Sequence, residues 1–418
     1  MSAMIKLPLD LPHVRILKTE LLPDEIIITV ESTRQSAVCH QCGRETRKFH
    51  TDGRTVRLRH LPILSRRVYI ELRPKRFECR NCSDRPTTTQ QLDWYDPHSP
   101  HTKAYEQSLL MSLINSTIAD VVRKQGVSEE AVLGALDRHI PSQVDWAEFT
   151  SLAVIGLDEI ARTKGHRDFV TIVSARPAPD RLAILGVLPG REKETVAAFL
   201  RTIPRPLRAT IRSACCDMYE GYVNAVKEEL PGVQVVIDRF HVAKAYRECA
   251  DKLRRSETRA IKAELPPEEY AGLKGSLWAF RRAPANLSPE EKEVLDLLFE
   301  CAPELQIAYH LREELTEIFE ADHTKASATC ALQAWSAQVR ESGLDCFDSF
   351  LTTLDNWLDE ITNYFLDRLT SGFVEGFNNK LKVLKRRCYG ILNLKHFFQR
   401  IYLDLEGYRL FGRRDRKI

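Results

Sequence analysis

The sequence predicts a multidomain α+β protein, and three features of the chain lead to this prediction. Two pairs of cysteines enclose strand-like segments near the N-terminus, a cluster of strands occupies the middle of the chain, and a long run of helical patterns follows that cluster. A chain of 418 residues with 43% hydrophobic content can bury more than one core, so two to four domains are expected.

Residues 1–90 are expected to form a zinc-binding ribbon. Cys39 and Cys42 form one Cys-x-x-Cys pair, Cys79 and Cys82 form a second, and the 36 residues between the pairs contain strand-like segments. Two such pairs that face each other across a small sheet supply four thiolates to one tetrahedral Zn²⁺. The spacer is longer than in the commonest zinc ribbons, and a redox role for the two pairs is the main alternative.

The other cysteines show no ligand spacing and are interpreted as core or incidental residues. They are Cys215, Cys216, Cys249, Cys301, Cys330, Cys346 and Cys388. The N-terminal residues lack the pattern of a signal peptide, and no apolar run approaches the roughly 18 to 20 residues of a membrane span. We therefore expect a cytoplasmic protein with reduced thiols.

A compact helical unit is expected over residues 91–145, after a linker rich in proline and polar residues. Three segments alternate apolar and polar positions at helical period: residues 103–113, 117–125 and 129–139. Gly126 lies in the turn between the last two segments, and Ser128 is the expected N-cap. This is the layout of a helix-turn-helix, whose second helix enters the major groove of DNA. A helical hairpin without DNA is the alternative.

The strands in the middle of the chain predict a catalytic core over residues 150–255. Three closely spaced strand patterns, LAVIGLDEI, FVTIVSA and LAILGVL, are followed by alternating helices and strands, so we expect a mixed sheet covered by helices. This order matches the ribonuclease-H-like fold. Residues 256–370 show only helical patterns and are interpreted as an all-helical insertion, and residues 371–418 are expected to return to the core as helices with a basic tail.

Positive charge is concentrated in two regions, although the net charge is only +3. Residues 38–85 carry thirteen Lys and Arg against five Asp and Glu, and residues 376–418 carry twelve against three. Such segregation indicates binding of a polyanion at both ends of the chain rather than nonspecific binding over the whole surface.

One carboxylate lies directly before the second basic region, in the segment SGFVEGFNNKLKVLKRRCYG of residues 371–390. If the segment is helical, Glu375 shares one face with Asn378, Asn379 and Lys382. An acid, two amides and a cation on one face suit a metal ligand beside a phosphate backbone. The further cations of the segment are Lys380, Lys385, Arg386 and Arg387. The alternative is a solvated basic helix with one incidental Glu.

Three carboxylates that are distant in sequence occupy positions where the predicted fold could bring them together. Asp158 lies within the first strand of the sheet, Asp217 lies just beyond the fourth strand, and Glu375 opens the helix after the insertion. Oxygen ligands of this kind hold two Mg²⁺ ions for in-line displacement at phosphorus. Because the chain has 58 Asp and Glu, an incidental trio is the alternative.

Four blocks of the sequence resemble the signature blocks of the ISL-three family of bacterial insertion-sequence transposases. They are LDEIARTKGHRDFVTIV, CCDMYEGYVNAV, VVIDRFHVAKAY and FVEGFNNKLKVLKRRCYG. The cysteine ribbon also resembles the zinc module of that family, so the resemblance extends over nearly the whole chain. It implies a DDE transposase in which Asp158, Asp217 and Glu375 bind two Mg²⁺ or Mn²⁺ ions per active site, with one structural Zn²⁺ in the ribbon.

The resemblance also implies the substrates and the assembly. Such an enzyme binds the terminal inverted repeats of its element as double-stranded DNA, cuts and joins strands with a target DNA, and works in the bacterial cytoplasm at the nucleoid. Because two ends must be held together, a homodimer or a larger homo-oligomer is expected. Two alternatives are a catalytically silent DNA-binding regulator derived from a transposase and a metal-dependent, structure-selective nuclease.

The motif DRFH supplies two further candidate site residues, Asp238 and His241. Related transposases carry an Asp-x-x-His near the active site, and the resemblance suggests that His241 contacts the scissile phosphate or holds a carboxylate. Alternatively, Asp238 merely caps the helix that begins near His241. Asp238 could also be confused with the second metal ligand.

Two candidates for DNA contact complete the set. A cationic hairpin after Asp158 could receive substrate phosphates or be a solvated turn; its residues are Arg162, Lys164, His166 and Arg167. Trp278 could stack on an unpaired base at the end of the element. Burial of Trp278 in the helical core is the favoured alternative, because most tryptophans of helical domains lie in the core.

Overall fold

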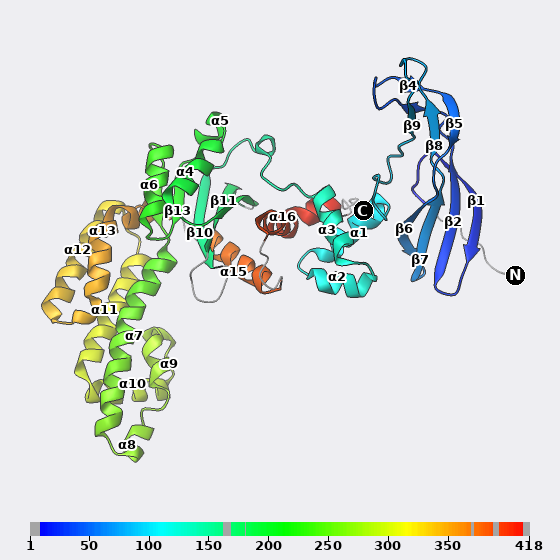
Figure 1. The fold of residues 1–418 in the computed structure, drawn as a ribbon. Helices are drawn as coiled ribbons and strands as arrows, with labels where there is room; N and C mark the ends of the chain where they lie inside the picture. Colours follow the sequence, from blue (N-terminus) through cyan, green and yellow to red (C-terminus); the bar gives the residue numbers. More distant parts are fainter. Residues whose placement is uncertain (1–8, 162–168, 180, 369–371, 388–392, 413–418) are drawn as a thin grey trace. The chain divides into compact units, whose positions relative to one another are not determined.

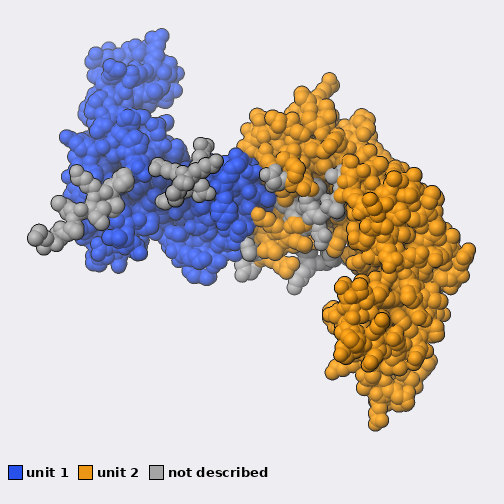
Figure 2. Space-filling view, turned by 180° about the vertical axis from the view of Figure 1, so that it is seen from behind, with its two compact units in different colours: residues 1–142, 387–389, 399–418 blue, residues 143–386, 390–398 orange. Residues whose placement is uncertain are grey.

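The computed structural model describes residues 9–161, 169–179, 181–368, 372–387 and 393–412 (Figure 1). The chain divides into two compact units, coloured blue and orange in Figure 2. Unit 1 comprises residues 1–142, 387–389 and 399–418, and unit 2 comprises residues 143–386 and 390–398. None of the described helices is long and apolar enough to cross a membrane.

Unit 1 begins with a four-stranded sheet in the order β1-β2-β7-β6. The strands are β1 (Val14–Leu21), β2 (Glu25–Ser32), β6 (Val56–Ile63) and β7 (Arg66–Leu72). Along β2, buried residues alternate with partly exposed ones, as expected for a strand with one face on a core. Ile28 of β2 packs in that core with Val68 and Ile70 of β7.

The cysteine ribbon is built from two smaller sheets. Strands β3 (Ala37–Val38) and β4 (Glu45–Thr46) pair with each other, and β5 (Lys48–Asp52), β8 (Lys75–Glu78) and β9 (Thr87–Thr89) form the order β5-β8-β9. Cys39 and Cys42 lie in the turn between β3 and β4, and Cys79 and Cys82 lie in the turn after β8. Short hairpins therefore place both cysteine pairs in turns, where thiols can gather.

The three helices expected in unit 1 are present, as α1 (Lys103–Leu113), α2 (Ile118–Gln125) and α3 (Glu129–His139). The expected cap of α3 is confirmed, because the Ser128 hydroxyl accepts a hydrogen bond from the backbone N–H of Ala131 at 3.2 Å. Gly126 ends α2 with φ of 58°, a left-handed conformation that favours glycine.

The C-terminal helix α16 (Leu394–Phe411) packs from residue 399 onward within unit 1. The buried Gln399 donates to the carbonyl oxygen of Ile140 at 2.8 Å, and Asp404 accepts from the backbone N–H of Asn115 at 3.0 Å. At Gly407 an added Cβ would lie 2.7 Å from a side-chain carbon of Ile114, so the glycine permits close packing. Residues 371–418 were expected to be helices of the catalytic core with a basic tail; of these, the residues from 399 onward group with unit 1.

Unit 2 contains a five-stranded mixed sheet in the order β12-β11-β10-β13-β14. The strands are β10 (Val154–Ala161), β11 (Phe169–Ala178), β12 (Arg181–Pro189), β13 (Ser213–Cys216) and β14 (Gln234–Ile237). The pairs β10–β11 and β11–β12 are antiparallel, whereas β10–β13 and β13–β14 are parallel. The connecting helices are α4 (Lys193–Thr202), α5 (Arg205–Arg208) and α6 (Glu220–Glu229).

Helix α7 (Arg239–Glu264) starts at the edge of this sheet and extends into a helical bundle (Figure 1). The bundle contains α8 (Pro267–Ala271), α9 (Ser276–Arg281), α10 (Pro289–Cys301), α11 (Pro303–Glu320), α12 (Lys325–Ser342), α13 (Asp348–Thr362) and α14 (Tyr364–Asp367). One apolar core runs from the sheet into the bundle and includes Val236 and Trp335. Helix α15 (Gly372–Arg387) follows the bundle.

Candidate functional site

The parallel register of unit 2 places three aspartates at one edge of the sheet. Leu157 of β10 pairs with Cys216 of β13, and Cys216 pairs with Ile237 of β14. The residue that follows each of these three is an aspartate: Asp158 within β10, Asp217 directly after β13 and Asp238 directly after β14. Because parallel strands present their carboxyl ends at the same edge, these neighbours in register lie side by side. The structure thus brings Asp158 and Asp217 together, as the sequence led us to expect.

His241 completes this edge from the first turn of α7. Its Nδ1 lies 3.2 Å from Oδ1 of Asp217, and its Nε2 lies 3.9 Å from Oδ2 of Asp238. Burial opposes the charged form of His241, but the hydrogen bond and charge of Asp217 outweigh burial and raise its pKa. Burial likewise opposes ionisation of Asp217, and the hydrogen bond from His241 nevertheless lowers the pKa of this carboxyl group.

Asp158 has a different electrostatic environment. Only 9% of its surface is exposed, and burial raises its pKa to about 6, with a smaller contribution from the charge of Asp217. The backbone N–H of Glu159 donates to Oδ1 of Asp158 at 2.7 Å, and the charges of His241 and Lys382 also favour the ionised form. A buried carboxyl group beside a second one is the arrangement in which a bound cation gives the greatest relief of charge repulsion.

Helix α15 supplies Lys382 and carries the third expected carboxylate. The helix begins at Gly372, so Glu375 lies in its first turn, as predicted. The side chains of Glu375, Asn378, Lys385 and Arg387 lie outside the described part of the structure. Leu381 and Leu384 form the buried face of α15. The exposed cationic and amide residues are Asn379, Lys382 and Arg386, with Lys380 partly buried.

The remaining residues of the DRFH motif have identifiable structural contacts. Oδ1 of Asp238 accepts a hydrogen bond from the backbone N–H of Phe240 at 2.7 Å, so Asp238 caps α7, as one of the two interpretations proposed. Arg239 pairs with Glu320 of α11 and donates to the hydroxyl of Tyr364 at 3.2 Å. Phe240 is exposed beside the ring of His241, a feature that the sequence did not indicate.

Two groups of predicted DNA contacts have different outcomes. The cationic hairpin of Arg162, Lys164, His166 and Arg167 lies outside the described residues. Trp278 was expected to be buried, and that expectation is wrong, because 63% of its surface is exposed. Helix α9 turns Ala279 and Phe280 into the core and leaves Trp278 on its outer side.

The four cysteines of the ribbon form a second site, in unit 1. Sγ of Cys39 lies 4.0 Å from Sγ of Cys82, and Sγ of Cys42 lies 3.7 Å from Sγ of Cys79. A tetrahedral Zn²⁺ with bonds of about 2.3 Å to sulfur requires sulfur atoms about 3.8 Å apart. All four sulfur atoms lie within 4.8 Å of one another, so the residues fit a closed Cys₄ zinc site. Both of these contacts join one pair to the other, as expected for four ligands of a single metal ion.

A third cluster contains Asp96, Glu106 and His139, but Glu106 already has its charge compensated. The buried Glu106 carboxylate pairs with Arg138, accepts a hydrogen bond from Ser99 at 2.6 Å and contacts Nε2 of His139 at 2.7 Å. Burial opposes its ionisation, yet these hydrogen bonds lower its pKa to about 2. We interpret the cluster as an ionic network that ties α1 to α3.

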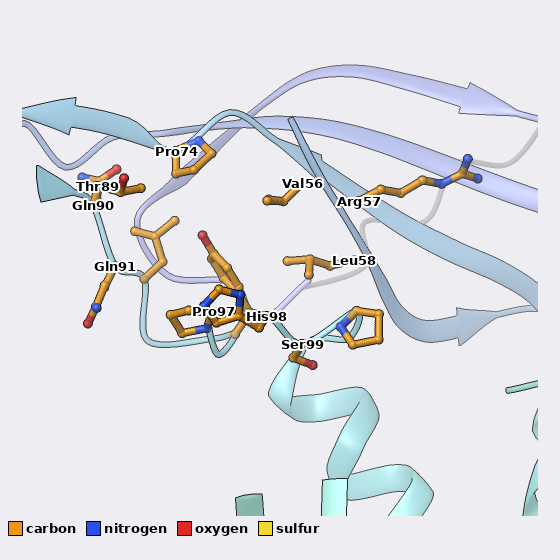
Figure 3. Close-up of a pocket in the computed structure, with 13 residues that line it drawn as sticks. Val56, Arg57, Leu58, Pro74, Thr89, Gln90, Gln91, Pro97, His98 and Ser99 are labelled. Atoms are coloured by element: carbon orange, nitrogen blue, oxygen red, sulfur yellow. The ribbon is translucent and has the colours of Figure 1, made fainter. Parts of the chain in front are cut away.

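Figure 3 shows a pocket of about 600 Å³ in unit 1. Val56 and Leu58 of β6 line it together with Pro74, and Pro97 and His98 line it from the segment that leads to α1. The described lining includes no carboxylate, so this pocket does not offer the chemistry of the aspartates in unit 2.

Aspartates next to one another in register on adjacent parallel strands, with a histidine in contact and the charge of a lysine acting on one of them, define a class of site suited to metal-dependent phosphoryl transfer. Residues 155–401 match the transposase domain of the ISL3 family, and residues 35–82 match the zinc finger of the transposases of IS204, IS1001, IS1096 and IS1165. The chain belongs to the ISL3 family of DDE transposases.

Curated relatives agree with this assignment. The transposase of insertion sequence IS1001 from Bordetella parapertussis is 28% identical over 381 residues, which cover 91% of each chain. The transposase of IS1557 from Mycobacterium tuberculosis is 24% identical over 400 residues, 90% of this chain and 88% of the relative. Among solved structures, the Drosophila P element transposase strand transfer complex aligns over 73% of this chain and 92% of its own chain, with a TM-score of 0.38 and 12% identity.

Proposed function

We propose that this transposase cuts and joins DNA at the sheet edge of unit 2, with Asp158, Asp217 and Glu375 as metal ligands. The observation that carries the proposal is the in-register placement of Asp158 and Asp217 on neighbouring parallel strands. The third carboxylate belongs to α15, the helix whose Lys382 acts electrostatically on Asp158. The strand order of the sheet, with three antiparallel strands followed by two parallel ones, supports a ribonuclease-H-like core.

The residues present fit a pair of divalent cations. Mg²⁺ and Mn²⁺ prefer carboxylate oxygens, and a buried carboxyl group whose pKa is raised to about 6 gains from a neighbouring positive charge. When bound, such ions would supply an activated oxygen nucleophile and charge stabilisation for the leaving oxygen. The chain itself contributes orientation, because His241 holds Asp217 and the N–H of Glu159 holds Asp158.

DNA recognition is assigned to unit 1 and to the basic surfaces of α15. We propose that the zinc ribbon and the helix-turn-helix of α2 and α3 read the terminal inverted repeats. The exposed Asn379, Lys382 and Arg386 support a phosphate-binding role for α15. Asn378, Lys385, Arg387 and the hairpin of Arg162, Lys164, His166 and Arg167 are proposed as further phosphate contacts. Because two ends are processed together, a dimer or larger assembly is proposed.

The test compares the wild-type protein with Glu375→Ala on labelled DNA that carries the ends of the element. Nicks and joined products are scored with Mg²⁺ and with a chelator. We expect metal-dependent nicking and joining that Glu375→Ala abolishes, while Glu228→Ala, an exposed acid of α6 that pairs with Lys193, remains active. Equal binding by both proteins without cleavage would support the regulator instead. Cleavage that never yields joined products would support the structure-selective nuclease.

A further inference from the structure

The four-stranded sheet of unit 1 has one covered edge and one open edge, at β6 and β1 respectively (Figure 1). The segment before α1 covers β6, because the backbone N–H of Arg59 donates to the carbonyl oxygen of Pro100 at 2.9 Å and the N–H of Thr102 donates to that of Arg59 at 2.9 Å. Within the described part of the chain, β1 pairs with β2 alone. The outer backbone groups of β1 can therefore accept a further strand.

Apolar side chains of β1 are exposed where the residues opposite them are buried. Ile16 lies opposite Val30 of β2, and Leu21 lies opposite Ile26. Opposite residues of an antiparallel pair point to the same face, so Ile16 and Leu21 lie on the core side of the sheet. Val30 and Ile26 are buried in that core, yet Ile16 exposes 52% of its surface and Leu21 exposes 68%. The cover of the core thus ends at β2.

The direction of the backbone groups follows from the hydrogen bonds at the two ends of β1. The carbonyl oxygen of His13 accepts from the N–H of Thr33 at 2.9 Å, and the N–H of Leu22 donates to the carbonyl oxygen of Glu25 at 2.8 Å, so both ends turn toward β2. Successive residues of a strand alternate in this direction. The residues whose N–H and C=O groups turn outward are therefore Val14, Ile16, Thr19 and Leu21. A β-bulge between residues 16 and 18 adds one residue at the centre of this series.

This series is symmetrical about the centre of β1, between Leu17 and Lys18. If two copies of β1 pair in antiparallel fashion about this point, position 14 lies opposite position 21, and position 16 lies opposite position 19. Every outward-turned residue then meets an outward-turned residue of the second copy. A bulge hinders pairing with a regular strand, whereas a second copy carries its own bulge at the same place. The edge therefore fits another copy of itself better than an unrelated strand.

The charges of β1 are complementary in the same register. Arg15 lies opposite Glu20 of the second copy, and Glu20 lies opposite Arg15 of the second copy, so the dimer contains this pair twice. Both side chains are at least partly exposed; within one chain Arg15 pairs with Glu31, and Lys18 lies 2.8 Å from Glu20. A register with position 15 opposite position 18 would instead place the like charges of Arg15 and Lys18 together, which is unfavourable. Charge thus selects the register that the backbone also favours.

We propose that β1 is a dimerisation strand, which pairs with β1 of a second copy of this chain and joins the two sheets into one. Ile16 and Leu21 of both copies are covered in this sheet. We refer to the paired residues 14–21 as the β1 interface. The inference rests on the proposed function in that an assembly of copies holds two DNA ends, and it names the surface through which the copies meet.

The first test exchanges the charges of the β1 interface in the full, zinc-loaded chain without DNA, and sedimentation velocity measures the association. We expect a wild-type dimer at micromolar concentration. Arg15→Glu and Glu20→Arg each place like charges together twice and weaken the dimer by about 5-fold or more. The double variant with both substitutions restores it. Within one chain the two positions are about 16 Å apart, at 3.3 Å per residue, so this recovery requires contact between copies.

Two matched pairs of variants test the backbone and the apolar contact. The N–H of Thr19 turns outward, so Thr19→Pro removes a hydrogen bond of the interface and none to β2, whereas Thr19→Ala keeps that N–H. We expect loss of the dimer in Thr19→Pro and a normal dimer in Thr19→Ala. Leu21→Ser weakens the dimer several-fold, and Leu64→Ser, at an exposed leucine between β6 and β7, does not. Circular dichroism and zinc content show whether each variant is folded, and if Thr19→Pro is not, the charge exchange decides alone.

Three outcomes would overturn the β1 interface. One is a wild-type protein that stays monomeric throughout the micromolar range; weaker DNA binding by Arg15→Glu would then assign this edge to DNA. Another is a dimer that none of the β1 variants weakens, because the copies then meet through a different surface. The third is a folded double variant that associates no better than Arg15→Glu.

Failure of the β1 interface and failure of the transposase proposal are distinguishable. A protein that forms the dimer through β1 but never joins DNA retains the interface and loses the proposed reaction. A protein that joins DNA, and whose association is the same in the wild type and in Arg15→Glu, retains the reaction and loses the interface.

Discussion

The imidazole of His241 lies between two carboxylates, with Nδ1 3.2 Å from Asp217 and Nε2 3.9 Å from Asp238. This placement fixes the ring from two sides at the start of α7. If Asp217 is a metal ligand, as we propose, His241 orients its carboxylate, and such neighbouring groups commonly matter nearly as much as the ligands do.

We expect His241→Ala to slow strand cleavage by about 10- to 100-fold and to raise the Mg²⁺ concentration required for half-maximal rate. The reason is that Asp217 loses its hydrogen-bond partner while its own oxygens remain. The measurement is a Mg²⁺ titration of cleavage by both proteins. Lys252→Ala, which removes an exposed side chain further along α7, is the control with normal metal dependence. An unchanged Mg²⁺ requirement in His241→Ala would show that the ring acts on the DNA instead.

Asp238 presents a choice between capping and metal binding that two substitutions can resolve. Asparagine also caps helices, so Asp238→Asn is expected to retain both stability and cleavage, whereas Asp238→Ala loses about 1 kcal/mol of stability through the missing cap. Thermal unfolding and cleavage rates are measured for both variants. Loss of cleavage in a fully stable Asp238→Asn protein would make this carboxylate a metal ligand and not a cap alone.

Parts of this site that depend on local sequence patterns could be predicted, whereas contacts that depend on how distant segments pack could not. Asp158 and Asp217 could be paired in advance, because one lies within a strongly apolar strand, the other directly follows a second one, and the two strands were expected to be neighbours. The contact of His241 with Asp217 could not be derived from periodicity, because it depends on how the first turn of α7 faces the sheet. The zinc ribbon could be predicted from the sequence, because the two cysteines of each pair lie only three residues apart.

Trp278 shows where sequence patterns fail. Helix α9 has only six residues, too few for an apolar period to reveal its inner face. Its inner face is made by Ser276, Ala279 and Phe280, and the largest residue of the helix lies outside. The packing of α16 on α1–α3 was equally hidden, because more than 250 residues separate the partners in sequence.

Removal of one ribbon cysteine is expected to release the zinc. Cys42→Ser leaves three thiolates, and a structural site with an incomplete ligand set loses both metal and local folding energy. We expect one Zn²⁺ per wild-type chain by elemental analysis, and much less in Cys42→Ser, with faster proteolysis between residues 35 and 89. Cys301→Ser, which changes an exposed thiol of α10, should retain the metal. Full zinc content in Cys42→Ser would rule out the four-cysteine site.

The ionic network around Glu106 predicts a pH dependence of stability in unit 1. The pKa of Glu106 falls from 4.5 to about 2 on folding, so its ionised form stabilises the folded state by up to about 3 kcal/mol at 1.36 kcal/mol per pKa unit. Because the folded pKa is the lower one, this stabilisation is complete above about pH 5 and is lost as the pH falls towards 2.

Glu106→Gln is therefore expected to lower the unfolding temperature of unit 1 at neutral pH, and the difference from the wild-type protein should shrink as the pH falls from 4.5 towards 2. Differential scanning calorimetry across this range provides the measurement. Glu129→Gln, at an exposed position of α3, is the control. A difference that stays constant with pH would show that the substitution acts through packing alone.

The final prediction concerns the buried contacts of α16 with the helices of unit 1. Asp404→Ala removes the acceptor of the partly buried N–H of Asn115, and loss of such a hydrogen bond costs about 0.5 to 1.5 kcal/mol. We expect faster amide hydrogen exchange in α1 and α3 and unchanged exchange in the sheet of unit 2, because the contact lies within unit 1. Tyr408→Ala, which removes an exposed side chain from the same helix, serves as the control and should leave exchange unchanged. If Asp404→Ala accelerates exchange only within α16 itself, this helix is an appendage of unit 1 and does not stabilise α1–α3.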